Sequence, residues 1–117
     1  MSLEKATRWA HLKYAQKLDA GVDADATVAV VVPVGEIPVV RWIDYSYNVP
    51  PDAGGLLTVT LGVTVVYQRQ ITSAAETKDG QVHFGDQPLV GADGEDIDVT
   101  LAAGGAACSG DVCICYE

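Results

Sequence analysis

From Thr27 onward the sequence alternates short runs of strand-forming residues with turn residues, and this pattern constrains the fold more than any other feature. The runs are rich in Val, Ile, Thr and Tyr, which fit a pleated, half-buried surface. Gly, Pro and Asp recur between them, as in residues 50–55, and these residues favour turns. Short strands at such spacing are typical of a sandwich or barrel. We expect strands at 27–33, 37–47, 55–61, 63–71, 81–84, 96–102 and 111–116.

Several of these runs alternate between apolar and polar residues, which predicts antiparallel strands with one buried face. In residues 57–61 and 97–101 the apolar residues all fall on odd positions. In residues 41–47 the odd positions, including Arg41, share one face, and Trp42, Asp44 and Ser46 share the other. Gly62, between two runs, predicts a tight hairpin or a bulge. The expected fold is an all-β antiparallel sandwich, and about seven or eight strands permit either a jelly-roll or an Ig-like topology.

Residues 2–18 have a different pattern, which predicts a helix. Ser2 suits an N-cap position, and no Gly or Pro occurs before Gly21. Leu3 and Tyr14 belong to an apolar stripe at helical spacing. A helix of this length is marginal alone, so its apolar face should contact another surface. We therefore expect residues 1–20 to form a basic helix or docking arm, and residues 27–117 to form the β-sandwich domain.

Charge is distributed unevenly between these two parts. The chain carries a formal charge of −9, with an excess of basic residues confined to residues 1–18. The acidic body disfavours nucleic acid and anionic membranes as partners. A basic arm on an acidic body suggests docking onto an acidic neighbour, including another copy of the chain, although a simple solvated helix is the alternative. The candidate partner-binding residues of the arm are Leu3, Arg8, Trp9, Lys13, Tyr14 and Lys17.

No residue pattern points to catalysis, a metal or a cofactor. The two histidines, His11 and His83, are not flanked by a recognisable nucleophile pattern, and His83 is expected to face solvent. Gly104 and Gly105 lack the Lys and Ser/Thr of a phosphate-binding loop. The acidic residues 93–98 could bind calcium, but a solvated turn is the favoured interpretation. We therefore expect a non-enzymatic protein without a cofactor.

The cysteines and aromatic residues leave alternatives open. Cys108, Cys113 and Cys115 could be free thiols packed as small apolar groups, could form one disulfide through Cys108, or could bind a metal. In a strand, Cys113 and Cys115 would share one face. Aromatic residues such as Trp42 could form a sugar-binding platform, but a core or interface role is favoured because only eight aromatic residues are present.

The first residues lack the apolar region of a signal peptide, and no apolar run approaches the roughly 20 residues of a membrane helix. We therefore expect synthesis in the cytoplasm. Export, if it occurs, would use a route other than classical secretion.

Residues 41–105 carry a series of motifs whose order resembles that of small β-sandwich structural proteins of tailed bacteriophages. The motifs are Trp42 with Tyr-Ser-Tyr at 45–47, Gly-Leu-Leu-Thr-Val-Thr at 55–60, Val-Tyr at 66–67, Ile-Thr-Ser-Ala at 71–74, Phe84 with Pro-Leu at 88–89, and Ile-x-Val-Thr-Leu-Ala-Ala-Gly-Gly at 97–105. The resemblance implies a virion role, either as a capsid decoration (cement) protein or as a tail-associated protein. Such proteins commonly form trimers or other symmetric oligomers, and the resemblance carries over no catalytic residue.

The function expected from the sequence is that of a non-enzymatic phage virion protein of the capsid decoration type, which docks onto the particle through its N-terminal arm. The expected partners are copies of itself, with a trimer favoured, and a major capsid or tail protein. Synthesis in the host cytoplasm and release within virions would fit the missing signal peptide. The alternative is a tail-associated receptor- or carbohydrate-binding β-sandwich module.

Overall fold

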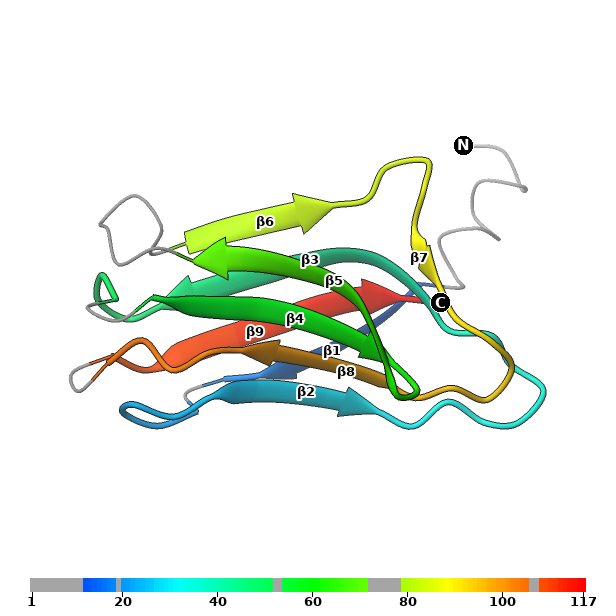
Figure 1. Cartoon of the computed structure of the whole chain (residues 1–117), viewed down its shortest axis with the longest axis horizontal. Helices are drawn as coiled ribbons and strands as arrows, with labels where there is room; N and C mark the ends of the chain where they lie inside the picture. Colours follow the sequence, from blue (N-terminus) through cyan, green and yellow to red (C-terminus); the bar gives the residue numbers. More distant parts are fainter. Residues whose placement is uncertain (1–11, 19, 52–53, 72–78, 106–107) are drawn as a thin grey trace.

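Two antiparallel sheets pack face to face in the computed structural model, which describes residues 12–18, 20–51, 54–71, 79–105 and 108–117 (Figure 1). Sheet A has the order β1 (Lys13–Lys17), β9 (Gly110–Tyr116), β3 (Val39–Tyr47) and β6 (Asp79–His83), and the short β7 (Leu89–Val90) pairs with β3. Sheet B has the order β2 (Ala26–Val30), β8 (Ile97–Leu101), β4 (Gly55–Leu61) and β5 (Thr64–Ile71). The predicted all-β sandwich is confirmed.

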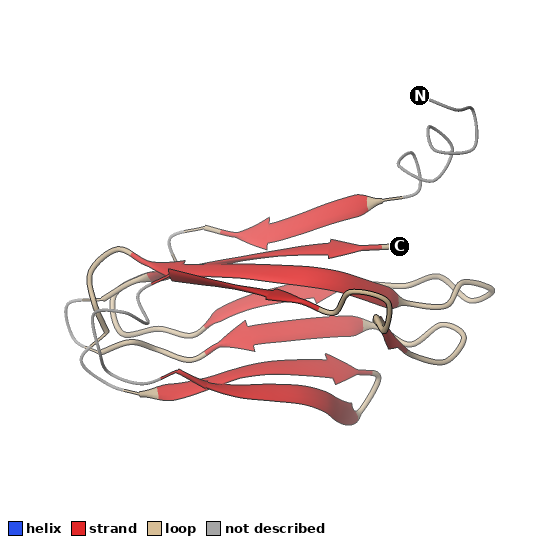
Figure 2. Ribbon diagram, turned by 90° about the horizontal axis from the view of Figure 1, so that it is seen from above, coloured by secondary structure: helices blue, strands red, loops and turns tan. Residues whose placement is uncertain are grey.

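The strand pairs are nested along the chain. The innermost pair, β4 and β5, is joined by a two-residue turn at Gly62 and Val63, and Gly62 has a φ of 64°. Outside it, β3 pairs with β6, β2 with β8, and β1 with β9. A positive φ suits glycine, and a two-residue loop with glycine first is a common hairpin turn. The hairpin expected at Gly62 is therefore present. The chain as a whole doubles back on itself like one long hairpin rolled into two layers (Figure 2).

The core lies between the sheets and follows the alternation expected from the sequence. The aliphatic residues at odd positions of β4 and β8 are buried, and so are Ile43, Tyr45 and Tyr47 of β3. Arg41 departs from the expectation, because a bulge between Val40 and Trp42 shifts the register against β9. Val40 is therefore buried, whereas Arg41 is only partly buried. Bulges of this kind re-aim side chains at the edge of a sheet.

The predicted helix over residues 2–18 is wrong for Lys13–Lys17, which form strand β1. This strand pairs along its whole length with β9, from Lys13 opposite Tyr116 to Lys17 opposite Val112. Ala15 lies opposite the buried Ile114 and packs against the core. Helix propensity is a weak preference that tertiary context overrides, and here the edge of β9 supplies hydrogen-bond partners for a strand. The rest of the predicted helix, up to His11, lies outside the described residues.

One end of the sandwich, which we call the loop end, brings together three loops and the ends of two strands. It contains the β2–β3 loop (31–38), the β4–β5 turn (62–63) and the segment 91–96 between β7 and β8. Strand β1 begins there and β9 ends there, since Lys13 pairs with Tyr116. The loop end is at the right of Figure 1. No helix in the described part of the chain is long and apolar enough to cross a membrane.

Candidate functional site

Hydrogen bonds join the three loops of the loop end, with segment 91–96 at the centre. The Gly35 amide donates to Asp93 Oδ1 at 2.8 Å, and the Val32 amide donates to Asp96 Oδ1 at 3.0 Å. The Gly62 amide donates to the backbone carbonyl of Asp96 at 2.9 Å. Two loops that are distant in the sequence are thereby fastened to a third. Loops fixed in this way can present side chains at defined positions, as binding loops on rigid scaffolds do.

These bonds also explain the acidic residues 93–98. Besides the two aspartates, Glu95 accepts a hydrogen bond on Oε1 from the Ala92 amide at 2.6 Å. Three carboxylates of the cluster are therefore engaged with backbone amides, which agrees with the turn interpretation. Within the described ranges, no group of three or more His, Cys, Asp or Glu side chains is arranged to hold a metal ion.

Large aliphatic side chains project from the same loops into solvent. Val34 is 94% exposed and Val63 is 96% exposed, at the tips of two different loops. Val31, Ile37 and Val90 are also more than half exposed. Single exposed apolar residues are ordinary, but several gathered on one surface mark an interaction site. The loop end therefore has the composition of a docking surface.

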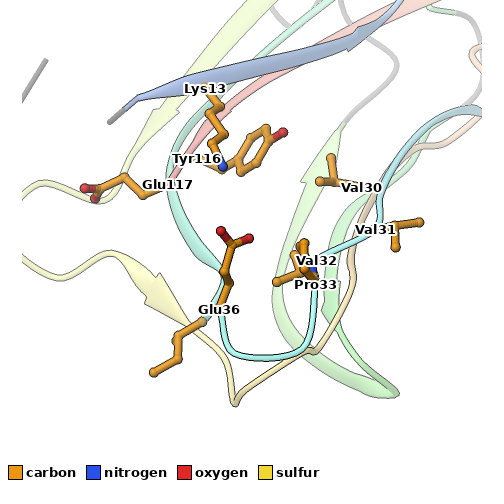
Figure 3. Close-up of a pocket in the computed structure, with 9 residues that line it drawn as sticks. Lys13, Val30, Val31, Val32, Pro33, Glu36, Tyr116 and Glu117 are labelled. Atoms are coloured by element: carbon orange, nitrogen blue, oxygen red, sulfur yellow. The ribbon is translucent and has the colours of Figure 1, made fainter. Parts of the chain in front are cut away.

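A pocket of about 380 Å³ lies beside these loops, between the start of β1, the end of β9 and the β2–β3 loop (Figure 3). It is within the range of about 300 to 1,000 Å³ that is usual for ligand sites. Six of its nine lining residues are aliphatic or aromatic, and the other three are charged. Its lining residues are Lys13, Val30, Val31, Val32, Pro33, Glu36, Ile37, Tyr116 and Glu117.

The charges of the pocket are only partly matched. Glu117 forms an ion pair with Arg41, the residue displaced by the bulge in β3. The Glu36 carboxylate points into the pocket toward Tyr116 (Figure 3), and neither Glu36 nor Lys13 forms an ion pair with another described side chain. Within the described residues, the pocket thus offers apolar side chains, the Glu36 carboxylate and the Lys13 ammonium group, neither of which is in an ion pair.

A second feature lies on the outer face of sheet A, where Tyr14, Cys115, Trp42 and His83 stand side by side on four strands; we call it the aromatic row. The Trp42 ring stacks on His83 with centroids 5.6 Å apart. On its other side Tyr14 packs edge-on to Trp42 at 6.1 Å. Cys115 lies between them and is fully buried, although it faces away from the core. The outer face of sheet B is different, because it carries a threonine pair, Thr27 and Thr100.

The cysteines are thiols, in agreement with the first of the three interpretations left open by the sequence. Cys113 and Cys115 are free and share the outer face of sheet A, as expected for a strand. Burial raises the pKa of both thiols, and the Asp44 carboxylate raises that of Cys113 further. The Cys108 thiol donates to the Val49 carbonyl at 3.4 Å. Raised pKa values keep Cys113 and Cys115 protonated and unreactive at neutral pH.

His83 faces solvent as expected. Besides its stacking on Trp42, its Nε2 atom lies 3.3 Å from Gln81 Oε1, on the same strand. Among the described residues it has no hydrogen bond to a serine, cysteine or carboxylate. His11 lies outside the described residues.

The predicted arm residues divide into two groups. Leu3, Arg8 and Trp9 lie outside the described residues. Lys13, Tyr14 and Lys17 lie on the edge strand β1, where Lys13 lines the pocket and Tyr14 belongs to the aromatic row. The structure thus brings Lys13 together with the loop end, which the sequence analysis did not connect to the arm. The exposed valines at and near the loop end are not among the site residues predicted from the sequence. The sequence signal that could have found them is a valine beside a glycine, as at Val34, Val63 and Val90.

Comparisons with protein-family models, with curated proteins and with solved structures gave no match to this chain. A functional interpretation therefore depends on the geometry of the loop end and of the aromatic row.

Proposed function

We propose that the chain is a non-enzymatic structural protein that attaches to a larger assembly, of the virion decoration type implied by residues 41–105. The observation that carries the proposal is the set of exposed aliphatic side chains on the fastened loops at the loop end. Of these side chains, Val31 and Ile37 line the same pocket as Lys13 at the start of β1, so the arm and the β2–β3 loop can contact one surface together. Exposure of these apolar side chains to water is unfavourable, and burial against an assembly partner would remove that exposure.

We infer that the sandwich is a jelly roll and not an Ig-like domain. In an Ig-like sandwich, consecutive strands such as A and B are in the same sheet. Here β1 and β2 are in different sheets, and so are β2 and β3. The nested pairs β1–β9, β2–β8, β3–β6 and β4–β5 follow the rolled-hairpin arrangement of a jelly roll. Viral capsid domains share this arrangement with lectins and cupins, so it supports a virion role by analogy only.

The proposed partners are copies of the same chain, with a trimer favoured, and a major capsid or tail protein. In a closed oligomer the loop ends can face the same direction, so that several weak contacts act together. Such multivalent attachment strengthens binding without any new contact. In this proposal the protein is a component of the virion, and its acidic body faces away from the particle.

The mass of the protein in solution, measured by light scattering, tests the proposal. The intact chain should form a closed oligomer, and deletion of residues 2–11 should dissociate it. Val34→Asp and Val63→Asp should each weaken assembly, because each places a charge on the loop end. Val22→Asp is the matched control, since Val22 is 63% exposed in the loop between β1 and β2, at the opposite end. A monomeric intact chain, or equal effects of all three substitutions, would contradict the proposal.

The second candidate is a tail-associated receptor- or carbohydrate-binding module, and the aromatic row is the observation that favours it. Sugar rings stack on open aromatic faces. In the aromatic row, His83 stacks on Trp42 and Tyr14 packs edge-on against it, whereas Tyr14 itself is 61% exposed. Trp42→Ala would separate the candidates: loss of glycan binding with unchanged assembly would favour the module, and unchanged binding on a glycan array would remove it.

A further inference from the structure

We propose that the pocket at the loop end binds the N-terminal segment, residues 1–11, of a second copy of the chain. In this arrangement Glu36 pairs with the basic side chain of Arg8, and the apolar wall receives Trp9. The proposal rests on the proposed function, in which the chain assembles through its N-terminal arm, and it names the surface that the arm contacts.

The chemistry of the pocket fits such an occupant. Val30, Val32 and Pro33 provide apolar contacts, and Tyr116 provides an aromatic one. Glu36 points into this space and has no ion pair within the described part of the chain. A ligand that combines an apolar or aromatic side chain with a neighbouring positive charge would satisfy both features. An anionic ligand would meet Lys13, but it would also face the carboxylates of Glu36 and Glu117, of which Glu117 is paired with Arg41.

Residues 1–11 provide this combination within the chain itself. Arg8 and Trp9 are adjacent, and Lys5 adds a second positive charge against the single acidic residue, Glu4. Arg and Trp are the residue types most enriched among those that dominate interface energies. The remainder of the chain is strongly acidic, so its own N-terminal segment is the complement of its surface charge.

The direction of β1 favours a second copy over the same chain as the source of the segment. Strand β1 starts at Lys13 on the rim of the pocket and runs away from it toward Lys17. Trp9 lies only four residues before Lys13, so binding in the pocket of its own chain would need a reversal of the backbone within those four residues. Residues 1–18 contain no Gly or Pro for such a turn. Eleven residues can span up to about 36 Å when extended, which is enough to reach a neighbouring pocket.

This geometry has a consequence for assembly. Each copy donates one segment and accepts one, and the exit point of the segment lies on the rim of the pocket that accepts another. Every segment is then bound and every pocket is filled only in a closed ring, of which the favoured trimer is one example. An open chain of copies would leave one pocket empty at its end.

A charge swap in the full-length chain tests the proposal. Glu36→Lys alone and Arg8→Glu alone should each raise the dissociation constant of the oligomer roughly tenfold or more, as for other close interfacial charge pairs. The double variant should return to near the original value, because the pair is restored with reversed charges. Asp79→Lys, which makes the same change in net charge on β6 outside the pocket, is the control and should have little effect. Sedimentation at several concentrations provides the constants.

The outcomes separate this proposal from the function on which it rests. If deletion of residues 2–11 dissociates the oligomer but Glu36→Lys behaves like the control, the arm docks elsewhere and the pocket proposal is overturned. If the double variant is as weak as the two single changes combined, the pairing of Glu36 with Arg8 is wrong. A deletion that leaves the mass unchanged would instead remove the proposed function itself. A chain that is monomeric at every concentration would overturn both.

Discussion

Replacing Tyr47 with phenylalanine should lower the free energy of unfolding by about 1–2 kcal/mol at neutral pH, because the partly buried Ala102 carbonyl loses its hydrogen-bond donor. Tyr47 is 2% exposed, at the far end of the core from the loop end, and its hydroxyl donates to the Ala102 carbonyl at 2.8 Å. Phenylalanine keeps the ring and its packing, so the loss isolates the hydrogen bond. The substitution should therefore leave assembly through the loop end intact.

The same residue predicts a change at high pH. Burial, with a smaller contribution from Cys108, raises the pKa of Tyr47 to about 12 from an unfolded value of 10.0. Below pH 10 the hydroxyl is protonated in both states, and its contribution to stability is complete. Between pH 10 and pH 12 the unfolded chain loses this proton first, so the contribution falls by about 1.4 kcal/mol per pH unit. Wild-type protein should therefore lose its advantage over Tyr47→Phe before pH 12.

Urea unfolding followed by circular dichroism at pH 7, 10 and 12 measures both effects. Subtracting the two unfolding energies at each pH removes the titration of all groups that the proteins share. Tyr67→Phe is the control, since the Tyr67 ring packs on Phe84 at 5.2 Å and its hydroxyl makes no hydrogen bond within the described residues. A difference between wild type and Tyr47→Phe that stays constant from pH 10 to pH 12 would refute the burial argument. No difference at pH 7 would refute the hydrogen-bond argument.

Three further predictions concern other parts of the sandwich. Gly80→Ala should destabilise the fold by about 1–3 kcal/mol in urea unfolding, because a Cβ there would lie 2.4 Å from the Tyr45 ring; an unchanged midpoint would show that Tyr45 moves freely. Tyr14→Ala should speed alkylation of Cys115, which it helps to cover, and peptide mapping that finds equal rates would contradict this. Asp96→Ala should accelerate hydrogen exchange of the Val32 amide and of the neighbouring amides of Val31 and Val34, since its carboxylate accepts a hydrogen bond from Val32; unchanged protection would mean that the other loop contacts hold the β2–β3 loop without it.

Strands such as β4 and β8 could be predicted because each has one buried and one more exposed face. The alternation of aliphatic residues with threonine from Leu57 to Leu61, after the turn residues 50–55, predicts a strand over residues 55–61, and β4 has these bounds. The bulge in β3 could not be predicted, because it depends on the register with β9 and not on the residues around Arg41. The two-residue strand β7 was missed for a similar reason, since so short a segment carries no periodic pattern.

The candidate site was less predictable than the fold. A valine beside a glycine can lie at the end of a strand or at the tip of a loop, and the sequence does not distinguish these positions. Only the hairpin geometry shows that Val63 is exposed. The acidic residues 93–98 suggested a turn, but their role in fastening two distant loops depends on contacts between residues about sixty positions apart, as between Gly35 and Asp93. The pocket likewise joins β1, β2 and β9, which only the nested topology brings together.

Strand β1 changes how the arm has to be tested. The segment Lys-Tyr-Ala-Gln-Lys contains no β-branched residue and favours a helix in isolation, so only its pairing with β9 makes it a strand. Deletion of residues 2–20 would remove this strand and leave the backbone of β9 as an open edge, which promotes aggregation. Deletion of residues 2–11 ends before Leu12 and keeps every β1–β9 pair. At protein concentrations low enough for the intact chain to be monomeric, the shorter deletion should therefore retain the melting temperature of the intact chain, and the longer one should lower it. If both melt alike, β1 contributes nothing to the body, and the arm extends to residue 20 after all.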